Sequence, residues 1–189
     1  PVIDPSDGQA FEAIARGNAA DIDQAVQAAR RAYEGAWGKL SAAERSRLLM
    51  KLAHKLQDHQ EELAQLEGRD CGKPMKQARA DAAAIVRYFE FYAGACDKFH
   101  GETIPYPDGY SVLTWREPHG VTGHVIPWNY PMQIFGRSVG GALAMSRPKS
   151  HGDSGWLLRC GSHVAQWCPG RGARRGPGPK RPKSRAQAS

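Results

Sequence analysis

Residues 120–131 read Gly-Val-Thr-Gly-His-Val-Ile-Pro-Trp-Asn-Tyr-Pro, an apolar run that leads into a turn containing two prolines. Pro127 and Pro131 each lack an N–H and fix φ, so the backbone around them cannot continue a regular helix or a central strand. The run 120–125, which is β-branched and punctuated by glycine, predicts a buried strand. Ligands usually bind at the turn that follows a strand in an α/β sheet. We therefore expect residues 126–131 to shape a binding site.

The side chains of this turn fit that expectation. Trp128 and Tyr130 are large aromatic residues, which are costly on a turn unless they wall a pocket. Asn129 offers an uncharged amide donor that can face an oxygen on which negative charge develops. The alternative interpretation is a proline-rich loop whose aromatic residues pack on the core. The residues of the turn alone leave both interpretations open.

Most of the remaining chain up to residue 145 has helical patterns. Apolar spacing and capping residues predict five helices. Asp21 is predicted to cap the first, which runs through Tyr33, and Ser41 begins the second with a capping box to Glu44. The other three are predicted from Asp58 to near residue 68, from about 76 to 100, and over 131–145. Their apolar stripes are expected to form the core, and they contain Ile22, Val26, Ala29 and Tyr33; Leu48, Leu49, Leu52 and Leu56; Ile85, Val86, Phe89 and Tyr92; and Ile134, Phe135, Val139 and Leu143. Residues 111–117 alternate as a strand. This mixture predicts an α/β fold.

The charge of the chain is strongly uneven along the sequence. The formal net charge is +7 over 189 residues, yet residues 1–145 carry 16 Lys and Arg against 18 Asp and Glu. Residues 146–189 carry 10 Lys and Arg against Asp153 alone and are dense in Gly, Pro and Ser. Such a composition buries too little apolar surface to offset chain entropy, so this basic tail is predicted to be disordered.

The motif Gly-Val-x-Gly-x-x-x-Pro-Trp-Asn-Tyr-Pro resembles a hallmark of the aldehyde dehydrogenase superfamily. Further ordered matches are Ile3-Asp4-Pro5-Ser6-Asp7-Gly8, Ala20-Asp21-Ile22-Asp23-Gln24-Ala25-Val26, Leu66-Glu67-Gly68-Arg69-Asp70-Cys71-Gly72-Lys73-Pro74, Gly101-Glu102-Thr103-Ile104-Pro105 and Trp115-Arg116-Glu117-Pro118-His119-Gly120-Val121. The resemblance covers about residues 3–145. It implies an incomplete aldehyde dehydrogenase-like fold, in which 1–145 form the N-terminal part of the Rossmann-like cofactor-binding domain and 101–119 form its oligomerisation arm.

The resemblance also implies site residues, a substrate and a cofactor. Asn129 matches the catalytic oxyanion-hole asparagine; Val125, Ile126, Pro127 and Trp128 match the turn beside the nicotinamide ribose; and Tyr130 and Ile134 match walls of the aldehyde tunnel. The implied cofactor is NAD or NADP, the implied substrate is a small-molecule aldehyde, and the complete family member is a homo-oligomer. The family's nucleophilic Cys, general-base Glu and glycine-rich nucleotide turn lie beyond the end of the resemblance. We therefore expect the 189-residue chain to have no dehydrogenase activity by itself.

The sequence that follows residue 145 departs from the family. The family continues with a short strand and a lysine-proline element, whereas Ser146-Arg147-Pro148-Lys149-Ser150-His151 stands here. Our hypothesis is that residues 146–189 are frameshifted or otherwise non-homologous sequence. Two further functions stay open: a truncated subunit that only associates with full-length relatives, and polyanion binding through the tail.

Other classes of site and partner are disfavoured. Cys71 and Cys96 are expected to be small buried residues, and Cys160 and Cys168 have a spacing that fits no familiar zinc pattern, so we predict no metal. The basic tail lacks the interleaved aromatic residues of specific nucleic-acid binding. No segment has the length or shape of a membrane span or signal peptide, which suggests a cytoplasmic protein.

Overall fold

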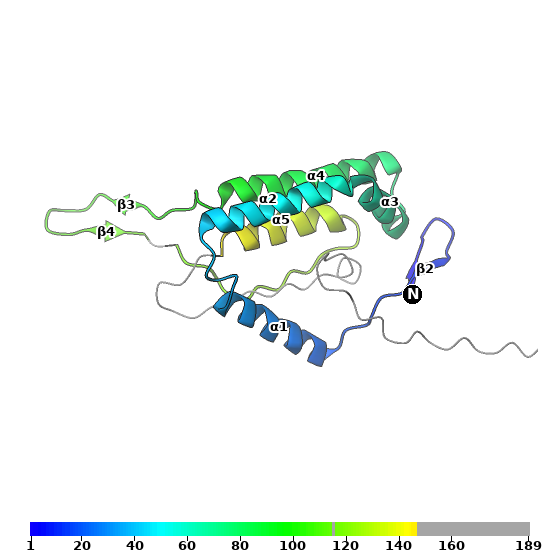
Figure 1. The fold of residues 1–189 in the computed structure, drawn as a ribbon, viewed down its shortest axis with the longest axis horizontal. Coiled ribbons are helices and arrows are strands. Elements are labelled where there is room, and N and C mark those ends of the chain that lie inside the picture. Colours follow the sequence, from blue (N-terminus) through cyan, green and yellow to red (C-terminus); the bar gives the residue numbers. More distant parts are fainter. Residues whose placement is uncertain (115, 147–189) are drawn as a thin grey trace, which may run out of the picture.

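The computed structural model describes residues 1–114 and 116–146. In chain order the elements are β1 (Val2–Ile3), β2 (Ala10–Glu12), α1 (Ala19–Glu34), α2 (Ala42–Asp58), α3 (Gln60–Cys71), α4 (Met75–Ala95), β3 (Thr103–Ile104), β4 (Val112–Leu113) and α5 (Pro131–Ala144). Helices α2, α4 and α5 run side by side, α3 packs on α4 at one end, and α1 lies apart from this bundle (Figure 1).

Capping residues define the starts of the first two helices. Helix α2 begins after Ser41, whose hydroxyl accepts from the Glu44 N–H while the Glu44 carboxylate accepts from the Ser41 N–H, as predicted. Helix α1 has the same arrangement between Asn18 and Asp21. The prediction that Asp21 caps α1 was therefore wrong by three residues, because Asn18 is the cap and Asp21 is its partner within the first turn.

The next two helices also differ from the prediction at their ends. Helix α3 continues through Gly68 to Cys71 and ends at Gly72, whose φ of +65° is the left-handed conformation that favours glycine at a helix end. Helix α4 ends at Ala95 rather than near His100, in a turn closed by the Lys98 N–H donating to the Ala95 carbonyl at 3.0 Å.

The core lies between α2, α4 and α5. Phe89 of α4 is fully buried, and Ile85 and Val86 point inward with it, as the apolar stripe predicts. Leu49 and Leu56 supply the buried face of α2, whereas the predicted core residue Leu48 is 42% exposed, since it lies one position off the buried stripe.

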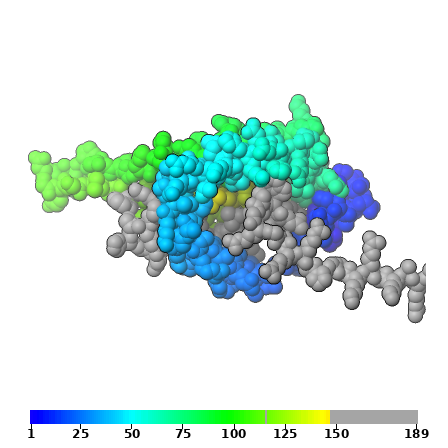
Figure 2. All heavy atoms as spheres, in the orientation of Figure 1, coloured from blue at the N-terminus to red at the C-terminus, as the bar shows by residue number. Residues whose placement is uncertain are grey.

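The described strands form two short antiparallel hairpins, β1–β2 and β3–β4. The second hairpin extends away from the helices as a narrow arm (Figures 1 and 2). Of the strand predicted over 111–117, the described residues 111–114 and 116–117 contain only Val112–Leu113 as a strand. The strand predicted over 120–125 was wrong: these residues form no ladder, because the described residues contain no further strand that pairs with them.

The end of α5 is fixed to the region that follows α1. Ser146 is buried, and its hydroxyl accepts from the Trp37 indole N–H at 2.7 Å and donates to the Leu143 carbonyl at 2.9 Å. The predicted tail otherwise lies outside the described residues. Among the residues that are described, every helix is too short or too polar to cross a bilayer.

Candidate functional site

The turn that precedes α5 presents most of the predicted site residues to solvent. Ile126 is buried and anchors the segment, whereas Val125 is 83% exposed and Trp128 is 74% exposed. Asn129 and Pro127 are also exposed. Two large apolar side chains on a solvent-facing turn indicate a surface that another group covers.

Tyr130 and Ile134 lie one helical turn apart at the start of α5. The Ile134 N–H donates to the Tyr130 carbonyl at 3.0 Å, and Pro131 occupies the first helical position, where its missing N–H costs nothing. Ile134 is half-buried and Tyr130 is 41% exposed. The structure thus brings the predicted substrate residues next to Asn129, on one short segment.

Behind the turn lies a buried ionic cluster that the sequence analysis did not identify. The Lys73 ammonium donates to the Glu67 carboxylate and, at 2.7 Å, to Asp81 Oδ2. Asp81 Oδ1 also accepts from the amides of Gln77 and Gln133, each at 2.7 Å. Asp81 is fully buried and Glu67 nearly so. The cluster therefore joins α3 to α4 through Lys73 and joins α4 to the first turn of α5 through Asp81.

The two carboxylates of this cluster have opposite pKa shifts. Burial raises the pKa of Glu67 to about 7, an effect that the ion pair with Lys73 only partly offsets. Burial also acts to raise the pKa of Asp81, but hydrogen bonds from Lys73, Gln133 and Gln77 outweigh it and the pKa is lowered. Burial would lower the pKa of Lys73, yet its two acidic partners raise it. Two carboxylates share one ammonium, so a proton on Glu67 makes the cluster neutral.

The cluster contacts the turn on both sides of Asn129. The Lys73 ammonium lies 4.6 Å from the centroid of the Tyr130 ring. The Cys71 thiol donates to the Trp128 carbonyl at 3.1 Å. In the sequence, the signal for these contacts is the Cys71-Gly72-Lys73-Pro74 element. It belongs to one of the segments that resemble the family, but the sequence alone predicts no role for its residues.

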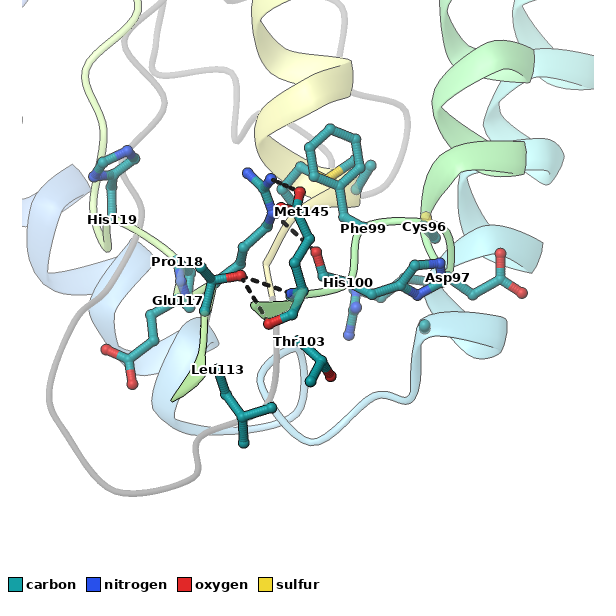
Figure 3. A pocket seen from close by; sticks show the side chains of 17 residues that line it. Cys96, Asp97, Phe99, His100, Thr103, Leu113, Glu117, Pro118, His119 and Met145 are labelled. Carbon is teal, nitrogen blue, oxygen red and sulfur yellow. Dashed lines mark hydrogen bonds and ion pairs between the residues drawn. The ribbon is translucent and has the colours of Figure 1, made fainter. Parts of the chain in front are cut away.

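A cavity of about 910 Å³ lies elsewhere, at the base of the arm (Figure 3). It is lined by residues of the arm and of the ends of α4 and α5, including Cys96, His100, Leu113, His119 and Met145. None of the predicted site residues lines it. Arg116 crosses this region, donating to the His100 carbonyl at 2.9 Å and lying 3.7 Å from the Glu102 carboxylate.

The described cysteines do not have the character of a nucleophile. Burial raises the pKa of Cys71 to about 11 and raises the pKa of the Cys96 thiol as well, so both are protonated at neutral pH. Within residues 1–114 and 116–146, no three His, Cys, Asp or Glu side chains gather closely enough to hold a metal ion. Cys160 and Cys168 lie outside the described residues.

Comparison with known proteins places this chain in a family. The model of the aldehyde dehydrogenase family matches residues 1–146, so the chain belongs to that family. It is 49% identical over 146 residues to aldehyde dehydrogenase family 2 member B4, mitochondrial, of Arabidopsis thaliana, and 45% identical over 146 residues to the mitochondrial benzaldehyde dehydrogenase of Antirrhinum majus. Each match covers 76% of this chain and 27% of the relative. The chain thus spans about a quarter of the length of these relatives.

Solved structures support the same assignment. A candidate aldehyde dehydrogenase from Burkholderia cenocepacia is 64% identical with a TM-score of 0.77, over 85% of this chain and 32% of that one. PnpE in complex with nicotinamide adenine dinucleotide is 38% identical with a TM-score of 0.73, over 84% of this chain and 31% of that one. The predicted fold class, a part of an aldehyde dehydrogenase-like fold with mixed helix and sheet, is confirmed.

Proposed function

We propose that this chain supplies the oxyanion-binding turn and one wall of the cofactor site of an NAD(P)-dependent aldehyde dehydrogenase, which oxidises an aldehyde to a carboxylic acid. The observation that supports this most directly is the turn 125–130, which is exposed except at Ile126, lies inside the family match and presents Asn129 between two aromatic residues. In this assignment the Asn129 side-chain N–H₂ donates to the aldehyde oxygen as it gains negative charge.

The flanking residues have separate roles in the proposal. The ribose of the nicotinamide is lined by Val125, Ile126, Pro127 and Trp128. The Val125 and Trp128 side chains are exposed, so they are available to contact this sugar. Tyr130 and Ile134 wall the path of the aldehyde. When bound, NAD or NADP supplies the hydride acceptor. The glycines Gly136, Gly140 and Gly141 lie inside α5 rather than at a strand-to-helix turn, so this segment does not bind the cofactor phosphates.

The chain alone is proposed to be inactive, because the described cysteines are protonated and the residues that match the family stop at 146. The proposed compartment is the cytoplasm, although the Arabidopsis and Antirrhinum relatives are mitochondrial by name.

Association with full-length relatives through the arm is the second candidate function, which the exposed Tyr110 and Leu113 side chains of the arm support.

A chimeric enzyme tests the main proposal. Residues 1–146 of this chain replace the equivalent segment of the Burkholderia cenocepacia relative, and aldehyde-dependent NADH or NADPH formation is measured. We expect an active chimera in which Asn129→Ala lowers kcat by about 10²–10³-fold, the usual effect of losing one oxyanion donor. The unmodified 189-residue chain should form none of the reduced cofactor.

Asn18→Ala is the matched control in the same chimera. It removes the same side chain from the cap of α1, where it affects stability and not the reaction. An Asn129→Ala chimera that is folded and keeps the kcat of its parent would refute the assigned role of Asn129.

A further inference from the structure

The usefulness of Asn129 as a donor depends on how firmly its turn is held, because a catalytic group must keep its productive geometry within about 0.5 Å. The turn itself offers little support. It is exposed at Pro127, Trp128 and Asn129, and no side chain caps the start of α5. The support must come from the residues packed behind it.

Both neighbours of Asn129 are held by the end of α3 and the loop that follows it. The Trp128 carbonyl accepts from the Cys71 thiol at 3.1 Å, and the Tyr130 ring lies under the Lys73 ammonium at 4.6 Å. We propose that Lys73 is a positioning residue, which fixes the turn through Tyr130 and thereby orients the Asn129 amide. The inference rests on the proposed function of Asn129 for its relevance to the reaction.

Lys73 is itself fixed by its partners. Its ammonium lies between the carboxylates of Glu67 and Asp81, and only 11% of its side chain is exposed. Moving the ammonium toward solvent would leave two buried carboxylates without a cation, which is strongly unfavourable. A cation held in this way is a rigid contact for an aromatic ring, and desolvation strengthens the cation–π attraction.

Asp81 extends the same support past the turn. Its Oδ1 accepts from the Gln133 amide at 2.7 Å, and Gln133 lies in the first turn of α5. The segment 128–133 is therefore held at the Trp128 carbonyl, at the Tyr130 ring and at the Gln133 amide. Lys73 joins the last two of these contacts, because it binds Asp81 and covers Tyr130.

Gly72 allows the loop to make these contacts. Its φ of +65° reverses the chain between α3 and α4, and an added Cβ there would lie 2.7 Å from Pro5 Cγ. The close approach and the left-handed backbone both require glycine. This conformation lets Cys71 and Lys73, on either side of Gly72, reach Trp128 and Tyr130, on either side of Asn129.

Alkylation of Cys71 reports the state of the turn without any substrate. The full chain carrying Lys73→Met is treated with iodoacetamide, and the labelling rates of Cys71 and of the buried Cys96 are measured separately by mass spectrometry. We expect Cys71 to react about tenfold faster than in the parent chain while Cys96 is unchanged, since tenfold corresponds to about 1.4 kcal/mol of lost contact energy. Loss of the Lys73 charge alone would raise the pKa of Cys71 and slow its alkylation, so faster reaction reports a loosened turn.

Two variants control this result. Lys73→Arg keeps a cation over Tyr130 and should restore slow labelling of Cys71. Arg79→Met removes an exposed α4 cation that pairs with Glu61 on α3, a carboxylate outside the Lys73 cluster, and should change neither rate. Parent-like Cys71 labelling in a folded Lys73→Met chain overturns the proposal.

A global loss of structure is recognised because Cys96 would then react together with Cys71. In that case the triple variant Glu67→Gln/Lys73→Met/Asp81→Asn removes the buried charges together, which spares the fold the cost of unpaired carboxylates. Glu67 and Asp81 raise the pKa of Cys71, so the triple variant is compared with Glu67→Gln/Asp81→Asn, which loses the same two carboxylates and keeps Lys73. We expect Cys71 to react about tenfold faster in the triple variant than in this double variant while Cys96 stays slow in both, and equal Cys71 rates overturn the proposal.

The chimeric enzyme separates positioning from a purely structural role. If Lys73 orients Asn129, Lys73→Met in the chimera lowers kcat more than it changes KM, and Lys73→Arg recovers kcat. A fully active Asn129→Ala chimera would refute the proposed function of Asn129. The labelling result would still be evidence that Lys73 holds the turn through Tyr130. The two proposals therefore fail on different measurements.

Discussion

At the scale of single residues, the buried cluster around Lys73 shows how position determines charge. Asp81 receives hydrogen bonds from three side chains, so it remains ionised. Glu67 receives the Lys73 ammonium on one oxygen, while its other oxygen, Oε2, is buried without a hydrogen-bond partner. The carboxylate with fewer donors is the one whose pKa burial raises.

This difference predicts an unusual pH dependence of stability. The pKa of Glu67 rises from 4.5 in the unfolded chain to about 7 in the folded one, so the folded state binds more protons between these values. The free energy of unfolding should therefore fall as pH rises from about 4.5 to 7, by up to about 3 kcal/mol from this group, and stay level above. Asp81, with its lowered pKa, has the opposite effect and loses its contribution on acidification below 3.8.

Urea unfolding of the parent chain and of Glu67→Gln between pH 4.5 and 8 measures the Glu67 contribution. The difference in stability between the two should shift in favour of the variant as pH rises. Glu34→Gln removes a carboxylate from the exposed end of α1 and serves as the matched control. A parent-to-variant difference that is independent of pH would contradict the raised pKa.

At the scale of the elements, α5 packs closely on α4 because it carries glycines at the contact. A Cβ on Gly140 would lie 2.7 Å from Tyr92 Cδ2, and one on Gly136 would lie 3.0 Å from Tyr88 Cδ2. Gly94 on α4 is different, because a Cβ there would meet nothing within 4 Å. The glycines of α5 thus lower its helix propensity but allow α4 and α5 to pack closely together.

Alanine substitutions measure this exchange. Gly94→Ala should leave the protein equally stable or stabilise it by up to about 1 kcal/mol through helix propensity. Gly140→Ala gains the same propensity but must displace the Tyr92 ring, which typically costs about 1–3 kcal/mol. Thermal or urea unfolding should therefore rank Gly140→Ala below Gly94→Ala, and equal stability of the two would show that the Tyr92 ring moves freely.

The elements also show which features a sequence reveals. The Ser41–Glu44 capping box and the stripe through Phe89 were predicted correctly, since both depend on residues close in the chain. The predicted strand 120–125 failed because a strand exists only where another strand pairs with it. The Lys73–Tyr130 contact joins residues far apart in sequence and has no period, so only the structure could place it beside Asn129.

At the scale of the whole molecule, the chain presents surfaces that its own described residues do not cover. The β3–β4 arm projects beyond the body (Figure 2) and carries exposed Tyr106, Tyr110 and Leu113. A two-stranded hairpin with apolar side chains and unpaired edges favours pairing with another chain. The family resemblance assigns the arm to subunit association, and this exposed surface supports that proposal.

We predict that Leu113→Lys weakens self-association of the 189-residue chain. Leu113 is 64% exposed in β4 of the arm, so a lysine is tolerated in the free chain but places a charge in an apolar contact. Sedimentation velocity over a range of concentrations should give a dissociation constant at least about tenfold higher than that of the parent. This change is in keeping with an interface residue that contributes more than about 1 kcal/mol. Phe91→Lys is the matched control, because Phe91 is equally exposed but lies on α4 in the body. If both variants associate like the parent, the arm does not mediate assembly; if both dissociate equally, the effect comes from added charge and not from the arm.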